Sequence, residues 1–91
     1  MKVRLTVEQS FLDAVRDLPP DRQKRVRAAL ERFTIEPTLA SLHFRRLQGT
    51  LNYFIINAAH GDRLILRKDD DTTYAVVDVG PHDNVYRRWN R

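Results

Sequence analysis

The segment from residue 79 to 87, VGPHDNVYR, brings several kinds of polar side chain together near the end of the given sequence. His82 can exchange a proton near neutral pH, Asp83 is its neighbour, and Tyr86 and Arg87 follow about one helical turn later. Cleavage of an RNA phosphodiester needs such groups, because the 2′-hydroxyl loses a proton, the 5′-oxygen gains one and phosphoryl charge must be offset. The segment is therefore a candidate ribonuclease site.

Arg63, which begins another strand-like run, can supply the cation that offsets phosphate charge if its strand neighbours the last strand. A purely structural alternative stays open for the terminal segment. In that alternative His82 and Asp83 form a turn and a helix cap, and Tyr86 packs against the sheet.

A small basic and aromatic patch, His43-Phe44-Arg45-Arg46, is a second candidate site. Aromatic rings stack on bases and arginines contact phosphates, so His43, Arg45 and Arg46, together with Arg87, are candidate RNA-binding residues. The alternative is that Phe44 is buried and both arginines are solvated.

Several other chemistries have no support in the residues. The chain has no cysteine, its histidines lack metal-ligand spacing, and its three glycines form no nucleotide-binding loop. Asp69-Asp70-Asp71 lacks the glycine and distal glutamate of a calcium loop and is expected to be a solvated turn. We predict neither a metal site nor a cofactor.

Composition indicates one small domain over residues 1–91 with a net charge of +4. Residues 1–50 contain ten Lys and Arg against six Asp and Glu, which suits a nucleic-acid backbone or an acidic protein partner. No stretch approaches the roughly 20 apolar residues of a membrane span, and the first residues lack a signal-peptide pattern. A cytoplasmic protein without membrane contact is expected.

The first half predicts a strand over residues 2–5 and a helical hairpin. Thr6 and Gln9 have the spacing of a capping box at the start of the first helix. Leu18-Pro19-Pro20 separates the two helices, because proline disfavours helical geometry in the residue before it. Both helices carry an apolar stripe at i, i+4 and i+7: Phe11, Val15, Leu18 in the first, and Val26, Leu30, Phe33 in the second.

The outer face of the second helix is expected to be solvated and basic, and its cations are Arg22, Lys24, Arg25, Arg27 and Arg32. Residues 38–50 are interpreted as a connection packed by leucines. Strands are predicted over residues 51–57, 63–68 and 73–79, with Gly80-Pro81 ending the last one. Their tight spacing favours an antiparallel meander, and Asp83 or Asn84 is expected to cap a short terminal helix. The predicted fold is α+β, in the order β-α-α-β-β-β-α, with the helical hairpin on one face of the sheet.

The ending of the chain resembles the VGHRxxVYR ending of the RelE/ParE toxin superfamily. Asp17-Leu18-Pro19-Pro20, Leu47-Gln48-Gly49 and Gly61-Asp62-Arg63-Leu64 also fall in the order of that family, so the resemblance covers nearly the whole chain. It implies a RelE-like fold, a toxin role in a type II toxin–antitoxin pair, and inhibition by a cognate antitoxin that wraps over the surface.

The RelE branch of the superfamily cuts messenger RNA in the decoding site of the ribosome without a metal. The resemblance implies that Arg63 matches an arginine of the middle strand, Tyr86 a C-terminal tyrosine, and His82 a position of arginine or histidine. Asp83 would support His82 in moving the proton. The chain departs from the RelE pattern at Phe54 and Ile56, where the ribonuclease has two lysines. These two residues are expected to form an apolar wall of the site, so the acid–base groups must come from elsewhere, for instance from His82, His43 or His60.

Three functions therefore stay open. The first is a ribosome-associated messenger RNA endoribonuclease. The second is a non-enzymatic toxin, of the ParE type that binds DNA gyrase or one that occupies a ribosomal or RNA site, which the loss of the two lysines favours. The third is a catalytically inactive RNA-binding relative.

Overall fold

The computed structural model describes residues 2–89 apart from the side chain of His60. The described chain contains five strands and three α-helices, in the order β1 Arg4–Val7, α1 Gln9–Arg16, α2 Pro20–Ile35, β2 Arg45–Arg46, β3 Tyr53–Asn57, β4 Asp62–Lys68, β5 Thr73–Pro81 and α3 His82–Trp89. Two short 3₁₀ turns, Ala40–Leu42 and Ala59–Gly61, lie before β2 and β4. None of the described helices has the length and apolar character needed to cross a membrane.

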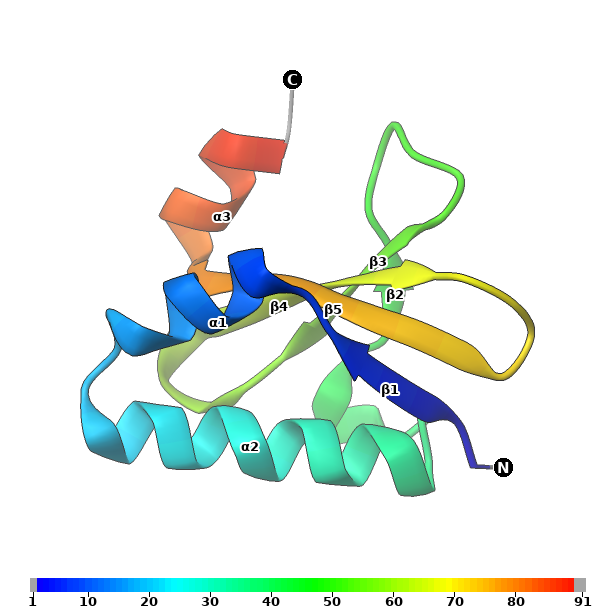
Figure 1. The fold of residues 1–91 in the computed structure, drawn as a ribbon, viewed down its shortest axis with the longest axis horizontal. Coiled ribbons are helices and arrows are strands. Elements are labelled where there is room, and N and C mark those ends of the chain that lie inside the picture. Colours follow the sequence, from blue (N-terminus) through cyan, green and yellow to red (C-terminus); the bar gives the residue numbers. More distant parts are fainter. Residues whose placement is uncertain (1, 90–91) are drawn as a thin grey trace.

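The strands form one sheet in the order β1-β5-β4-β3-β2 (Figure 1). The meander of β3, β4 and β5 is antiparallel as predicted, and β1 pairs with β5 in parallel, with Arg4 opposite Thr73 and Val7 opposite Val76. The α+β fold with a helical hairpin on one face is confirmed. Helices α1 and α2 cover one face, and α3 lies over part of the opposite face (Figure 1). We call these the helix face and the open face.

Side chains alternate between the two faces along each strand, so each face has its own core. The helix-face core joins the stripes of α1 and α2 to alternate strand residues, and its most buried members include Val26, Phe33, Ile56, Leu64 and Val76. The open-face core is smaller and consists of Leu47, Ile55, Ile65, Ala75, Val77 and Val85. Both predicted helix stripes point into the helix-face core.

Four local expectations differ from the structure. The capping box at Thr6 is wrong: Glu8 precedes α1 without a side-chain cap, and Gln9 donates to Asp13 instead. The predicted connection over residues 38–50 contains β2, which pairs with β3. Strand β5 continues through Gly80 to Pro81, and α3 starts directly at His82, so neither Asp83 nor Asn84 precedes the helix as a cap. Pro81 is the last residue of the strand and lies beyond the part of β5 that pairs with β1, which ends at Val76.

A β-bulge in β5 changes the alternation close to α3. Ile65 pairs with Asp78 and Leu66 pairs with Val76, so Val77 is an extra residue on β5. Val77 belongs to the open-face core, and the next residue, Asp78, bonds to side chains of α3 on the same face. The bulge therefore places a carboxylate where the terminal helix lies.

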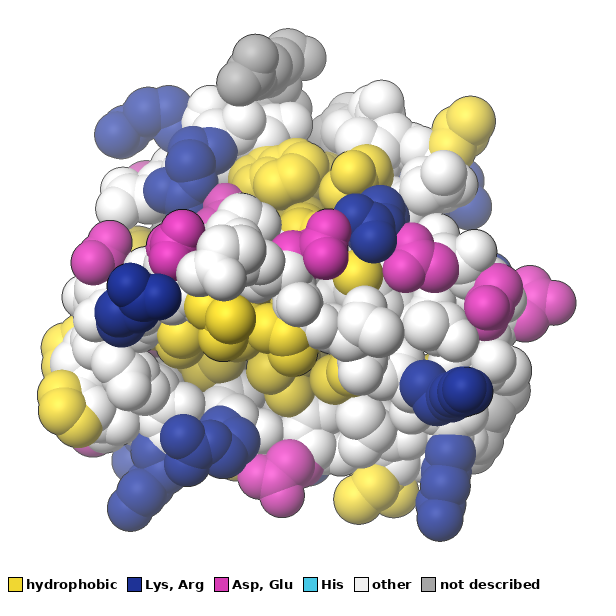
Figure 2. All heavy atoms as spheres, viewed as in Figure 1, with side chains coloured by type: hydrophobic (Ala, Val, Ile, Leu, Met, Phe, Trp, Pro, Cys, Tyr) yellow, Lys and Arg dark blue, Asp and Glu magenta, His cyan; other side chains and the backbone are white. Residues whose placement is uncertain are grey.

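The outside of the helical hairpin has an apolar groove of 240 Å³ between α1 and α2, lined chiefly by Phe11, Leu12, Val15, Val26 and Leu30. Apolar side chains gather between the two helices in Figure 2, and Lys and Arg side chains lie along the lower edge of the molecule, where α2 runs. Lys24, Arg25, Arg27 and Arg32 are exposed as expected, but Arg22 turns inward to a buried carboxylate.

Candidate functional site

The open face brings polar side chains from four neighbouring segments together. Arg45 on β2 lies opposite Ile55 on β3. Asn57, two residues after Ile55, points to the same face of the sheet. Asn57 lies opposite Arg63 on β4, and Arg63 lies opposite Gly80 on β5. Paired residues of antiparallel strands point to the same face, so these side chains form a row across the sheet.

Arg45 connects this row to the terminal helix. Its Nη1 donates to Asn57 Oδ1 at 3.0 Å and to the carbonyl oxygen of His43 at 2.6 Å, and its Nη2 donates to the hydroxyl of Tyr86 at 3.1 Å. The planar guanidinium is well suited to hold several acceptors in fixed directions. Arg45 thus orients the Tyr86 phenol over the end of β3.

Arg63 contributes a cation to the same face and is half-buried. Its Nη1 donates to the carbonyl oxygen of Asp62 at 3.2 Å, whereas its Nε is buried without a hydrogen-bond partner among the described residues. A buried donor left without an acceptor costs about 1–3 kcal/mol. Because the residue as a whole is only half-buried, part of the Arg63 side chain is accessible to an anionic ligand on the open face.

His82 begins α3 and faces Tyr86 one turn later, with the two ring centroids 4.4 Å apart. His82 Nδ1 lies 3.1 Å from an Asp83 carboxylate oxygen, and the His82 side chain is 55% exposed. Asp83 is 85% exposed, so its interaction with His82 is a surface contact. The imidazole is accessible to a substrate from outside.

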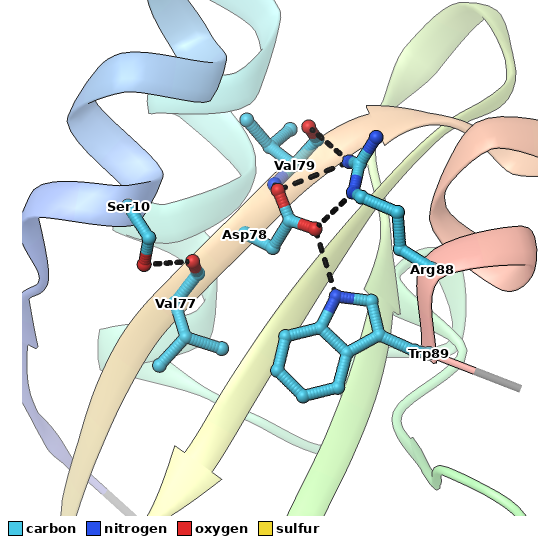
Figure 3. Close-up of polar contacts among 6 residues, drawn as sticks. All are labelled: Ser10, Val77, Asp78, Val79, Arg88 and Trp89. Atoms are coloured by element: carbon cyan, nitrogen blue, oxygen red, sulfur yellow. Dashed lines mark hydrogen bonds and ion pairs between the residues drawn. The ribbon is translucent and has the colours of Figure 1, made fainter. Parts of the chain in front are cut away.

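Helix α3 is held on the sheet by Asp78, whose side chain is 10% exposed (Figure 3). Its carboxylate accepts from Arg88 Nε at 2.9 Å, Arg88 Nη2 at 3.1 Å, Trp89 Nε1 at 2.7 Å and the backbone N–H of Val79 at 2.8 Å. Val85 is fully buried beneath the helix, and a Cβ on Gly80 would lie 3.4 Å from it. The glycine and the carboxylate together set how closely α3 approaches the sheet.

Not every sequence-predicted residue lies in this cluster. Arg46 points to the helix face, where its guanidinium lies 5.8 Å from the Phe54 ring centroid. The side chains of His43 and Arg87 are exposed, and His43 reaches the cluster through its carbonyl oxygen. The side chain of His60, a further acid–base candidate, is outside the described part of the structure.

The expectation that Phe54 and Ile56 form an apolar wall of the site is wrong. Both side chains pack in the helix-face core, and Phe54 stacks on Phe44 with ring centroids 5.0 Å apart. Tyr53, Ile55 and Asn57 are the residues of β3 that face the other way. Strand alternation explains the difference, since a shift of one residue exchanges the two faces.

Sequence reasoning missed Asn57, Asp78 and Arg88. Asn57 ends a predicted strand, and its face follows by counting two residues from Ile55 once the buried face is known. Asp78 sits in a run of valines and is the acidic residue of that run, which is the one signal for a buried carboxylate. Among the described side chains, no three of His, Asp, Glu or Cys lie together as metal ligands do.

Comparison with known proteins supports the fold. No protein-family model and no curated protein sequence matches the chain. A mutant of the Escherichia coli toxin RelE in the free state is similar over 99% of this chain and 96% of its own, with a TM-score of 0.72 and 20% identity. The RelE toxin in the RelB–RelE complex of Methanococcus jannaschii gives a TM-score of 0.71 at 17% identity, covering 91% of this chain and 96% of that one.

A third similar structure is the toxin–antitoxin complex RelBE2 of Mycobacterium tuberculosis, with a TM-score of 0.61 and 21% identity. It covers 89% of this chain and 99% of that chain. The chain therefore has the RelE fold over nearly all of its length.

Proposed function

We propose that the chain is a toxin of a type II toxin–antitoxin pair that cuts messenger RNA on the ribosome at its open face. The observation that carries the proposal is the convergence of Arg45, Arg63, Tyr86 and His82 on one exposed surface, from segments far apart in the sequence. Two cations, a phenol and an imidazole fit the needs of phosphodiester cleavage.

In the proposed reaction the 2′-oxygen of one nucleotide attacks the adjacent phosphorus while the bond from phosphorus to the 5′-oxygen breaks. The products are a 2′,3′-cyclic phosphate and a 5′-hydroxyl. Arg63, which is half-buried on the open face, holds the scissile phosphate with the accessible part of its guanidinium and offsets the charge that develops on it.

His82 takes the proton of the 2′-hydroxyl and then gives a proton to the leaving 5′-oxygen, because it is exposed and can act as base and as acid, whereas an arginine cannot be deprotonated in a protein. Tyr86, fixed by Arg45, orients a base by stacking or hydrogen bonding. Asp83 has a minor supporting role, since it is highly exposed.

An antitoxin is the proposed protein partner. The similar structures include RelE toxins bound to RelB antitoxins, among them the complex from Pyrococcus horikoshii. The exposed cations of α2, Lys24, Arg25, Arg27 and Arg32, suit an acidic segment of such a partner, or ribosomal RNA. The proposed place of action is the cytoplasm.

The gyrase-binding alternative depended on Phe54 and Ile56 replacing two lysines. Both side chains lie in the helix-face core and do not line the open face. Their apolar character therefore no longer supports the gyrase-binding alternative. A supercoiling assay with purified DNA gyrase tests this alternative, and we expect no inhibition.

The decisive experiment is expression of the chain in a bacterium, followed by sequencing of messenger RNA 5′ ends. New ends with a 5′-hydroxyl are expected for the wild type, and His82→Gln and Arg63→Met should reduce cleavage about 100-fold or more, the usual range for an acid–base or charge-stabilising group. Arg4→Met removes an exposed arginine from β1 and is the matched control for lost charge. Absence of new ends, or unchanged cleavage by both site variants, would contradict the proposal.

A further inference from the structure

We infer that Arg22, on the helix face, is a positioning residue for Arg63 on the open face and acts through Asp62. This inference rests on the proposed function, because it explains how the site keeps its phosphate-binding arginine in place.

Arg22 lies in the first turn of α2 and forms a two-pronged ion pair with Asp62, the first residue of β4. Its Nε donates to Asp62 Oδ2 at 3.0 Å and its Nη2 donates to Asp62 Oδ1 at 2.5 Å. The Asp62 side chain is 1% exposed, and the two residues are 40 positions apart. A paired fork of this kind fixes direction as well as distance, so α2 anchors the start of β4.

The backbone of Asp62 carries this anchoring to Arg63. The Asp62 carbonyl oxygen accepts from the Ala58 N–H at 2.9 Å and from Arg63 Nη1 at 3.2 Å. Successive residues of a strand point to opposite faces, so the Asp62 carboxylate faces α2 while the Arg63 side chain faces the site. Holding Asp62 in place therefore fixes the backbone position from which the Arg63 side chain extends. It also fixes the Asp62 carbonyl oxygen, which accepts a hydrogen bond from Arg63.

The position of Asp62 at the start of β4 also sets the distance between Arg63 and His82. Asp62 pairs with Pro81, the residue before His82, and Arg63 pairs with Gly80. Gly61, just before Asp62, has a φ of +82°, a conformation that glycine adopts freely. The Arg22–Asp62 pair thus restrains the first residue of β4, directly after a glycine whose backbone can adopt many conformations.

Arg22→Met tests the inference, because it keeps the aliphatic stem but leaves the Asp62 carboxylate without its cation. We expect the Nε–H signal of Arg63, assigned by NMR with an Arg63→Lys variant, to broaden and to exchange faster with water. We also expect RNA cleavage to fall about 10- to 100-fold, mainly in kcat, because displacing a reacting group by about an ångström has effects of that size.

Two controls separate positioning from general stability. Val26→Ala removes a buried side chain from the same helix and destabilises the fold, yet it should leave the Arg63 signal and kcat close to wild type. Arg4→Met makes the same substitution at an exposed position of β1 and should change neither. If Arg22→Met does not fold, Asp62→Asn carries the test, since it removes the charge and keeps the shape.

The inference fails if Arg22→Met or Asp62→Asn leaves the Arg63 Nε–H signal as sharp and protected as Val26→Ala does. A wild type that does not cut RNA overturns the proposed function alone. In that case the NMR comparison still decides whether Arg22 positions Arg63.

Discussion

Two adjacent arginines, Arg45 and Arg46, point to opposite faces of the sheet, and this direction decides which of them belongs to the proposed site. Arg45 reaches Asn57 and Tyr86 on the open face, whereas Arg46 lies over Phe54 on the other face. The sequence suggests one basic patch, because the two residues are neighbours and β2 is only two residues long. Pairing of β2 with β3 separates them, and a strand this short has no periodicity from which it can be predicted.

We expect Arg45→Met to lower RNA cleavage about 10-fold or more, and Arg46→Met to change it less than about 3-fold. The reason is that only Arg45 holds the Tyr86 hydroxyl and adds positive charge to the proposed site. Single-turnover cleavage of a messenger RNA on purified ribosomes measures both variants. Tyr86→Phe should combine with Arg45→Met less than additively, because the two side chains contact one another. Equal losses for Arg45→Met and Arg46→Met would place the site elsewhere.

At the scale of elements, the carboxylate of Asp78 makes several of the polar contacts that attach α3 to the sheet. Asp78 accepts from both Arg88 and Trp89, and Val85 supplies the buried apolar contact (Figure 3). His82 and Tyr86 belong to this helix, so its attachment determines whether they remain near Arg45 and Arg63. The apolar positions of the helix could be predicted from sequence, but the β-bulge that turns Asp78 toward α3 could not, because it arises from pairing with β4.

Asp78→Ala is expected to loosen α3 before the rest of the fold unfolds. Loss of the shared acceptor should destabilise the attachment by about 1–3 kcal/mol. The chain has a single tryptophan, Trp89, so its fluorescence reports on α3 while far-ultraviolet circular dichroism reports on the whole chain. In a urea titration the fluorescence transition of Asp78→Ala should precede the dichroism transition, and in wild type the two should coincide. Coincident transitions in the variant would show that α3 does not detach separately.

At the scale of the whole molecule, Arg67 links segments that are distant in the chain. It donates from Nη1 to Glu8, before α1, at 3.0 Å and from Nε to Asp69, in the turn between β4 and β5, at 2.7 Å. The hydrogen bond from Arg67 lowers the pKa of Asp69 below its ordinary value of 3.8. A backbone hydrogen bond from Thr72 lowers the pKa of Asp70 in the same turn.

These lowered pKa values predict the direction of an acid response. A carboxyl whose pKa is lower in the folded state stabilises the fold fully above its unfolded value and loses that contribution as pH falls through the folded value. Stability is therefore expected to fall below about pH 4. Urea unfolding from pH 7 to pH 2 should show the difference between wild type and Arg67→Met narrowing below that pH. Arg25→Met is the control, and a difference that stays constant with pH would contradict the role of Asp69.

Most of the helices and strands can be predicted from the sequence, but fewer of the contacts that build the candidate site can. Helix stripes such as Val26, Leu30 and Phe33, and the closely spaced strands of the meander, are local patterns, and they are found as expected. The parallel pairing of β1 with β5 joins residues more than 60 positions apart, so no local pattern shows it. The inward turn of Arg22 has the same cause, since its partner Asp62 is defined only by the assembled fold.

The position of β5 between β1 and β4 also constrains the order in which the newly made chain can fold. Of the five described strands, β1 is synthesised first and its partner β5 last, so β1 stays unpaired until α1, α2 and the three other strands have been made. Such distant contacts delay folding relative to contacts between neighbours in the chain. Helix α3, with His82 and Tyr86, follows β5 directly. A ribosome must therefore synthesise every element from β2 to α3 before the open face is complete.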